Sequence, residues 1–186
     1  MLYISVLATL SENIRRVFPK DTEQSPAEYT FRLVCTNCRE DHDAPIRVNR
    51  FESHDMPGSK GKASFVMKCK FCGQECSINL TRTKEDLNNL DEETNLELIE
   101  QTKKDRKKNG LKSVPIEQAL WLGLDCRGCE VTKFETADTT FVAELVSKKE
   151  IEFQFEDDEN EWYDYDEDAG EVVSVVDMQF DVIKGK

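Results

Sequence analysis

Alternation of apolar and polar residues with a period of two is the pattern of a β-strand with one buried face. It recurs in five segments of the chain, residues 1–10, 29–35, 65–69, 151–155 and 176–182. It is clearest in the last of these, where Val176, Met178, Phe180 and Val182 alternate with acidic and amide residues. Because such strands build antiparallel sheets with one solvated face, the pattern predicts an all-β fold.

The stretch from residue 81 to residue 112 has a different composition. Its acidic residues come first and its basic cluster, residues 103–108, comes last, an order that suits the dipole of a helix. Its apolar residues form only a patchy stripe. We therefore expect a charged connector, either a surface helix or a partly disordered segment, that ends at Asn109 and Gly110. The connector divides one compact domain into two β halves, residues 1–80 and 113–186.

Two Cys-x-x-Cys pairs, Cys35 with Cys38 and Cys69 with Cys72, each follow a predicted strand. Four thiolates match the tetrahedral shell that Zn²⁺ prefers. A redox Cys-x-x-Cys motif usually opens a helix, and neither pair is followed by a helical pattern. Four protein sulfurs also leave no position for a catalytic water. The pairs therefore predict one structural Zn²⁺ per chain and no enzymatic activity.

Three further cysteines, Cys76, Cys126 and Cys129, do not supply the four ligands of a second site. Cys126 and Cys129 form a third Cys-x-x-Cys pair that has no partner pair. We expect incidental thiols, and the alternative is a metal- or thiol-handling protein that uses them for metal transfer or a redox response. His42 and His54 lie between the zinc pairs and are expected to be solvent-facing loop residues.

The chain of 186 residues carries a net charge of −13, with a pI near 4.7. Such a charge argues against binding to nucleic acid phosphates and to anionic membrane surfaces. No segment approaches the roughly 20 apolar residues of a membrane span, and the N-terminal segment lacks the basic start of a signal peptide. We expect a soluble cytoplasmic protein with reduced thiols, with a nuclear location left open.

The run from residue 156 to residue 168 concentrates acidic residues around three aromatic ones. The plainer interpretation is a solvated loop with its aromatic rings tucked onto a sheet edge. The functional interpretation is a docking patch for a basic protein partner, in which aromatic rings anchor and carboxylates steer. The candidate patch comprises Trp162, Tyr163, Asp164, Tyr165, Asp166 and Glu167.

Several motifs in order along the chain resemble the eukaryotic CXXC-motif-containing zinc-binding protein family, long classed as a domain of unknown function. These are Cys35-Thr-Asn-Cys38, the turn at residues 57–61, Lys68-Cys69-Lys70-Phe71-Cys72-Gly73, Cys126-Arg127-Gly128 and the segment at residues 162–167. The resemblance implies two sandwich-like β halves, with zinc in the first held by Cys35, Cys38, Cys69 and Cys72. It brings no enzymatic activity. In that family the position of Cys129 is usually apolar, and the connector is usually shorter.

Overall fold

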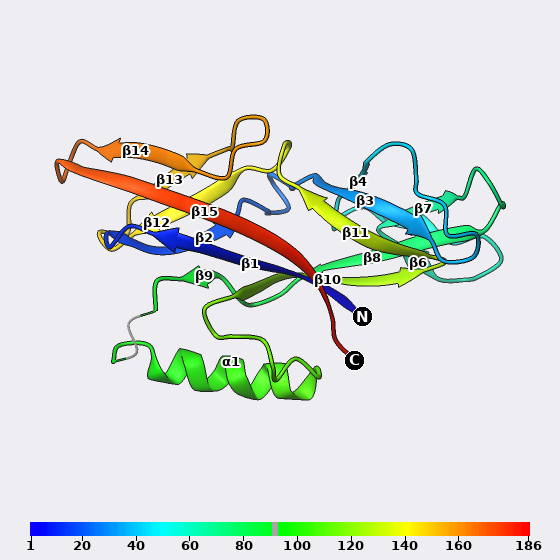
Figure 1. Ribbon diagram of the computed structural model, residues 1–186, viewed down its shortest axis with the longest axis horizontal. Helices are drawn as coiled ribbons and strands as arrows, with labels where there is room; N and C mark the ends of the chain where they lie inside the picture. Colours follow the sequence, from blue (N-terminus) through cyan, green and yellow to red (C-terminus); the bar gives the residue numbers. More distant parts are fainter. Residues whose placement is uncertain (91–92) are drawn as a thin grey trace.

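Antiparallel strands dominate the secondary structure of the protein, a computed structural model that describes residues 1–90 and 93–186 (Figure 1). The elements are β1 (Leu2–Leu10), β2 (Ile14–Pro19), β3 (Tyr29–Cys35), β4 (Ile46–Val48), β5 (His54–Asp55), β6 (Lys62–Ala63), β7 (Phe65–Lys68), β8 (Glu75–Arg82), β9 (Leu87–Asn88), α1 (Leu96–Lys108), β10 (Ala119–Arg127), β11 (Cys129–Glu135), β12 (Phe141–Leu145), β13 (Glu150–Phe153), β14 (Trp162–Asp166) and β15 (Glu171–Lys184). The predicted all-β class is confirmed. No helix within the described ranges is long and apolar enough to cross a membrane.

A six-stranded sheet with the order β14-β15-β1-β10-β8-β7 runs through the whole molecule. Two smaller sheets, β13-β12-β2-β9 and β11-β3-β4, accompany it at opposite ends (Figure 1). Each end of the molecule is thus a β region, and the long strands β1, β10 and β15 join the two. The sheets mix early and late parts of the chain, because β1 lies between β10 and β15 and β3 pairs with β11.

Aromatic side chains fill the core where the sheets meet. Trp121 of β10 is 1% exposed, and its ring centroid lies 5.7 Å from that of Phe141. Phe180 of β15 contacts both of these rings and also packs edge-on against Phe134 of β11 at 4.9 Å. Because one strand supplies contacts to several sheets, the two ends share a continuous core.

The face expected for the C-terminal strand is correct only in part. Met178 is buried, but Val176 pairs with the exposed Thr9 and lies on the outer face of the sheet. The register shifts between Leu7 and Thr9, and Asp177 takes a positive φ of 53°. A bulge at Asp177 adds one residue to β15, so the side chains before and after it exchange faces. The buried residues before the bulge are Val173 and Val175 instead.

The connector is more ordered than its composition indicates. Helix α1 covers only its second part, and it ends as expected at Asn109, followed by Gly110 with a φ of 73°. Its first part contributes the end of β8 and the short strand β9. Residues 91 and 92 of the predicted connector lie outside the described residues.

One residue of the basic cluster, Arg106, is buried rather than placed on the surface of the predicted connector. Arg106 is 4% exposed, and its guanidinium donates to both carboxylate oxygens of Glu85, at 3.1 and 2.7 Å. It also donates to the carbonyl oxygens of Val114, Pro115 and Gln118. A guanidinium has five N–H donors in a rigid fork, so one side chain can hold α1, its following loop and the sheet together.

Candidate metal centre

The two Cys-x-x-Cys knuckles have the same backbone hydrogen bonds. The N–H of Cys35 donates to the carbonyl of Glu40 at 3.0 Å, and the N–H of Cys69 donates to that of Gln74 at 2.8 Å. A second pair of bonds returns from the fifth residue of each knuckle, Arg39 or Gly73, to the carbonyl of the first cysteine. Each knuckle therefore closes on itself as a tight turn and projects its two sulfurs to the same side.

The fifth residue of each knuckle adopts left-handed backbone geometry, with a φ of 74° at Gly73 and 63° at Arg39. Glycine takes this conformation at no steric cost. Arg39 takes it with a side chain, which costs about 1 kcal/mol or more. The sequence analysis did not single out Arg39, because arginine carries no signal for a left-handed backbone.

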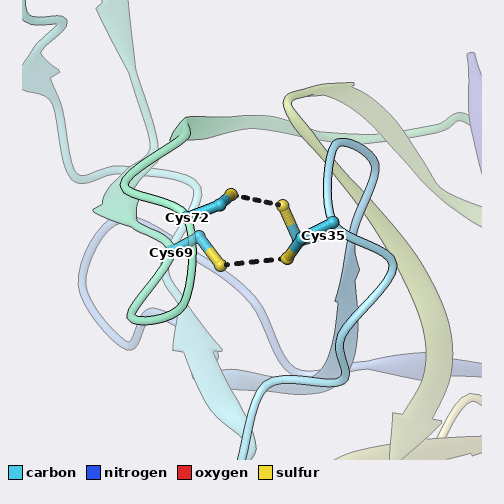
Figure 2. A group of neighbouring side chains, drawn as sticks. Cys35, Cys69 and Cys72 are labelled. Atoms are coloured by element: carbon cyan, nitrogen blue, oxygen red, sulfur yellow. Dashed lines mark hydrogen bonds between the residues drawn. The ribbon is translucent and has the colours of Figure 1, made fainter.

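The four cysteine sulfurs converge on one point. The Sγ atoms of Cys35 and Cys72 are 3.7 Å apart, as are those of Cys38 and Cys69, and all four lie within 4.8 Å of one another. Figure 2 shows the sulfurs of Cys35, Cys69 and Cys72 turned toward one another between the two knuckles. Four sulfurs about 2.3 Å from a tetrahedral zinc ion would be about 3.8 Å apart. The arrangement therefore fits a Cys₄ zinc shell.

Hydrogen bonds from the knuckles favour the metal-binding thiolate form at Cys72 and Cys35. At Cys38 the backbone N–H of Glu40 acts in the same direction, but burial and the neighbouring thiols outweigh it and raise the pKa to about 12. The side-chain amide of Asn37 and then the backbone N–H of Gln74 lower the pKa of the Cys72 thiol to about 6. The backbone N–H of Cys38 is the main cause that lowers the pKa of Cys35. Because only the thiolate coordinates zinc, lower pKa values reduce the cost of deprotonation on binding.

Gly128 connects this centre to the later part of the chain. Its carbonyl accepts hydrogen bonds from the backbone N–H of Thr36 in the first knuckle, at 3.1 Å, and from the thiol of Cys76, at 3.3 Å. Its φ is 74°, and a Cβ at this position would lie 2.1 Å from the carbonyl oxygen of Glu75. Only glycine fits here, and Gly128 thereby joins the first knuckle to the start of β8. Sequence reasoning did not assign it this role.

The other candidate ligands lie outside the cluster. Among the described residues, the one group of three or more Cys, His, Asp or Glu side chains with metal-ligand spacing consists of the four knuckle cysteines. Cys76 and Cys129 are buried, and Cys129 stands opposite Cys35 in the β3–β11 ladder. Cys126 is half-buried. His54 is exposed and contacts Glu52, whereas His42 is half-buried rather than solvent-facing.

The structure divides the acidic–aromatic candidate patch into two sets. Trp162 faces inward, with its ring stacked on Phe153 at 4.3 Å. Asp166 is also buried and accepts a hydrogen bond from the ammonium of Lys149 at 2.9 Å. Tyr163 and Tyr165, by contrast, point outward and are 61% and 54% exposed. The exposed set also includes Asp164 and Glu167.

Comparison with protein-family models matches residues 3–183 to the family described as "CXXC motif containing zinc binding protein, eukaryotic". The chain belongs to this family. The family resemblance noted in the sequence is thereby confirmed. Neither the family description nor the names of the relatives below states an enzymatic activity.

Relatives in this family span the full length of the chain. The protein "UPF0587 protein YCR090C" of Saccharomyces cerevisiae is 45% identical over 100% of this chain and 99% of its own. The human "CXXC motif containing zinc binding protein" is 26% identical over 97% of this chain and 96% of its own. The crystal structure of C1orf123 covers 98% of both chains with a TM-score of 0.72 at 24% identity, and it shows the same fold.

Proposed function

We propose that Cys35, Cys38, Cys69 and Cys72 hold one Zn²⁺ ion whose role is structural, and that the protein is not an enzyme but acts through contacts with other proteins. The convergence of four sulfurs at near-tetrahedral separations is the observation that carries the metal assignment. With four sulfur ligands, the ion has no position left for a reacting water.

The segment that leads into the second knuckle depends on this ion because it has few other stabilising contacts. The strands β5 and β6 have two residues each, and β7 has four. Cys72 and its neighbour Phe71 are exposed. Short strands and exposed turns cannot offset their own ordering entropy, so the binding free energy of the metal would serve as folding free energy.

Replacement of one ligand tests the structural role. Cys69→Ser should abolish zinc retention and lower the melting temperature by roughly 10 °C, because a metal-held segment loses its staple. Cys126→Ser is the matched control, since Cys126 lies outside the cluster, and it should leave both quantities nearly unchanged. Differential scanning calorimetry in reducing buffer measures the change. Equal melting temperatures for Cys69→Ser and the wild type would refute a structural role.

The protein-contact part of the proposal is supported by the exposed tyrosines of β14. Tyr163, Tyr165 and the paired Val172 lie on one face of the sheet, and each is more than half exposed. Exposed aromatic side chains are typical anchors of protein interfaces. Carboxylates surround them, so the surface suits a partner with a basic contact region. The surface formed by Tyr163, Asp164, Tyr165, Glu167 and Val172 is called the tyrosine surface below.

Affinity purification from a cell extract compares the wild type with the double variant Tyr163→Ala/Tyr165→Ala. Proteins that bind the wild type should be lost from the double variant, which removes both anchors without touching the core. Phe71→Ala is the control, because Phe71 is a similarly exposed aromatic residue at the zinc-bearing end. Retention of the same proteins by the double variant would contradict the assignment of the tyrosine surface.

A further inference from the structure

Strand β14 is at one end of the six-stranded sheet and pairs only with β15 within the described residues. Figure 1 shows it on the rim of the molecule, with no element beyond it. An edge strand presents a row of backbone N–H and C=O groups that can pair with another chain. The hydrogen bonds of β14 determine which of these groups are available.

Backbone groups of Tyr163 and Tyr165 point to the open edge. The carbonyl of Asn160 accepts the N–H of Met178 at 3.0 Å, so this residue faces β15. In an antiparallel pair the residues that face the partner alternate with those that face away. The backbone groups of Asn160, and two and four residues later those of Trp162 and Asp164, therefore face β15. The backbone N–H and C=O groups of Tyr163 and Tyr165 face the open edge.

The open edge is covered by a carboxylate rather than by a strand. The N–H of Tyr165 donates to Oδ1 of Asp164, its own neighbour in the chain, at 2.7 Å. A basic side chain that pairs with Asp164 would release this N–H for a backbone bond. Charged side chains at sheet edges commonly prevent unwanted strand pairing. Here the covering charge is negative, so a positively charged segment is the one that can displace it.

The charge around the edge is strongly one-sided. No lysine or arginine occurs in the sequence between Lys149 and Lys184. Glu161, Asp164 and Glu167 form no ion pair with any described residue, and all are exposed. A second copy of this chain would bring a like-charged edge against this one, which is unfavourable. Charge complementarity therefore favours a basic occupant over a self-associated dimer.

We propose that the open edge of β14 binds an extended segment of a partner protein in which basic and apolar residues alternate. This inference rests on the proposed protein-contact function and specifies its mode. The segment adds a strand to the sheet. Its apolar side chains lie beside Tyr163 and Tyr165 on one face, and its basic side chains reach Asp164 on the other. Main-chain hydrogen bonds form with Tyr163 and Tyr165.

The binding test uses a fluorescent, acetylated octapeptide of alternating valine and lysine, followed by anisotropy with the full-length wild-type protein. Binding should weaken as salt is raised, because exposed charges are screened. A block peptide of the same composition, with all lysines before all valines, should bind at least tenfold more weakly. Equal binding of the alternating and block peptides would overturn strand addition, because a purely electrostatic surface does not read residue order.

The main-chain hydrogen bonds are tested by changing first the backbone of the peptide and then the backbone of β14. N-methylation of the peptide residues that face β14 should lower affinity at least tenfold, and this change cannot unfold the protein. Tyr163→Pro should bind more weakly than Tyr163→Ala, because both lose the ring but only proline also loses the outward N–H. Phe71→Ala should bind like the wild type.

The outcomes separate this inference from the proposed function. If N-methylation has no effect while Tyr163→Ala/Tyr165→Ala still weakens binding, protein contact stands and strand addition falls. If the double variant binds the peptide like the wild type, both fall. A wild-type dimer that Tyr163→Pro converts to monomer would assign the edge to a second copy and overturn the basic-segment proposal.

Discussion

At the scale of single residues, each buried charged side chain among the described residues forms an ion pair. Asp166, 3% exposed, accepts hydrogen bonds from Lys149 and from the backbone N–H of Asp168, and its carbonyl accepts the N–H of Gly170. One residue thus organises the turn between β14 and β15. The hydrogen bond from the Lys149 ammonium is the main cause that lowers the pKa of the Asp166 carboxyl.

The lowered pKa of Asp166 gives a pH-dependent contribution to stability. The unfolded chain holds the Asp166 proton up to a pH of about 3.9, whereas the folded protein releases it at a lower pH. The contribution is therefore complete above about pH 4 and is lost as the pH falls through the folded-state pKa. Asp166→Asn should lower the urea midpoint at pH 7, and its difference from the wild type should shrink below pH 4.

Asp168→Asn is the matched control for this experiment. Asp168 contacts the same ammonium at 3.0 Å, but its side chain is 84% exposed against 4% for Asp166. An exposed ion pair contributes little to stability, so Asp168→Asn should change the midpoint much less. Equal effects of the two variants at pH 7 would show that Asp166 does not organise the turn.

At the scale of elements, α1 is attached to the sheets mainly through Arg106 and Ile99, its two buried residues. Removal of one partner of a buried ion pair typically costs about 3–5 kcal/mol, because the other charge remains buried. Arg106→Ala should therefore detach α1, seen as faster proteolysis within residues 96–108. Lys107→Ala, on the exposed side of the helix, is the control. Unchanged proteolysis of Arg106→Ala would show that the helix is held by other contacts.

Sequence patterns predicted the positions of the strands better than they predicted which side chains of a strand are buried. The alternation at residues 29–35 corresponds to β3, whose Tyr29, Phe31, Leu33 and Cys35 are all buried. The same reasoning placed Val176 wrongly, because a bulge adds a residue without any change in composition. Arg106 was misplaced for a related reason, since a charged residue indicates exposure and its partner Glu85 is 21 positions away in the chain.

At the scale of the whole molecule, the six-stranded sheet joins two ends, and each end contains strands from both of the predicted halves, residues 1–80 and 113–186. Cysteine spacing indicated which four sulfurs come together, because each pair is a local turn that directly follows a strand, β3 or β7. The contribution of Gly128 was not predictable in this way. It depends on the pairing of β3 with β11, which brings residues about a hundred positions apart into contact.

The zinc content of the purified wild-type protein tests the central claim most directly. The protein is prepared in reducing buffer without added metal, and its zinc is measured by inductively coupled plasma mass spectrometry against protein concentration. The account predicts about one zinc ion per chain, as expected for a closed Cys₄ site. A wild-type protein that is folded, reduced and free of metal would contradict it.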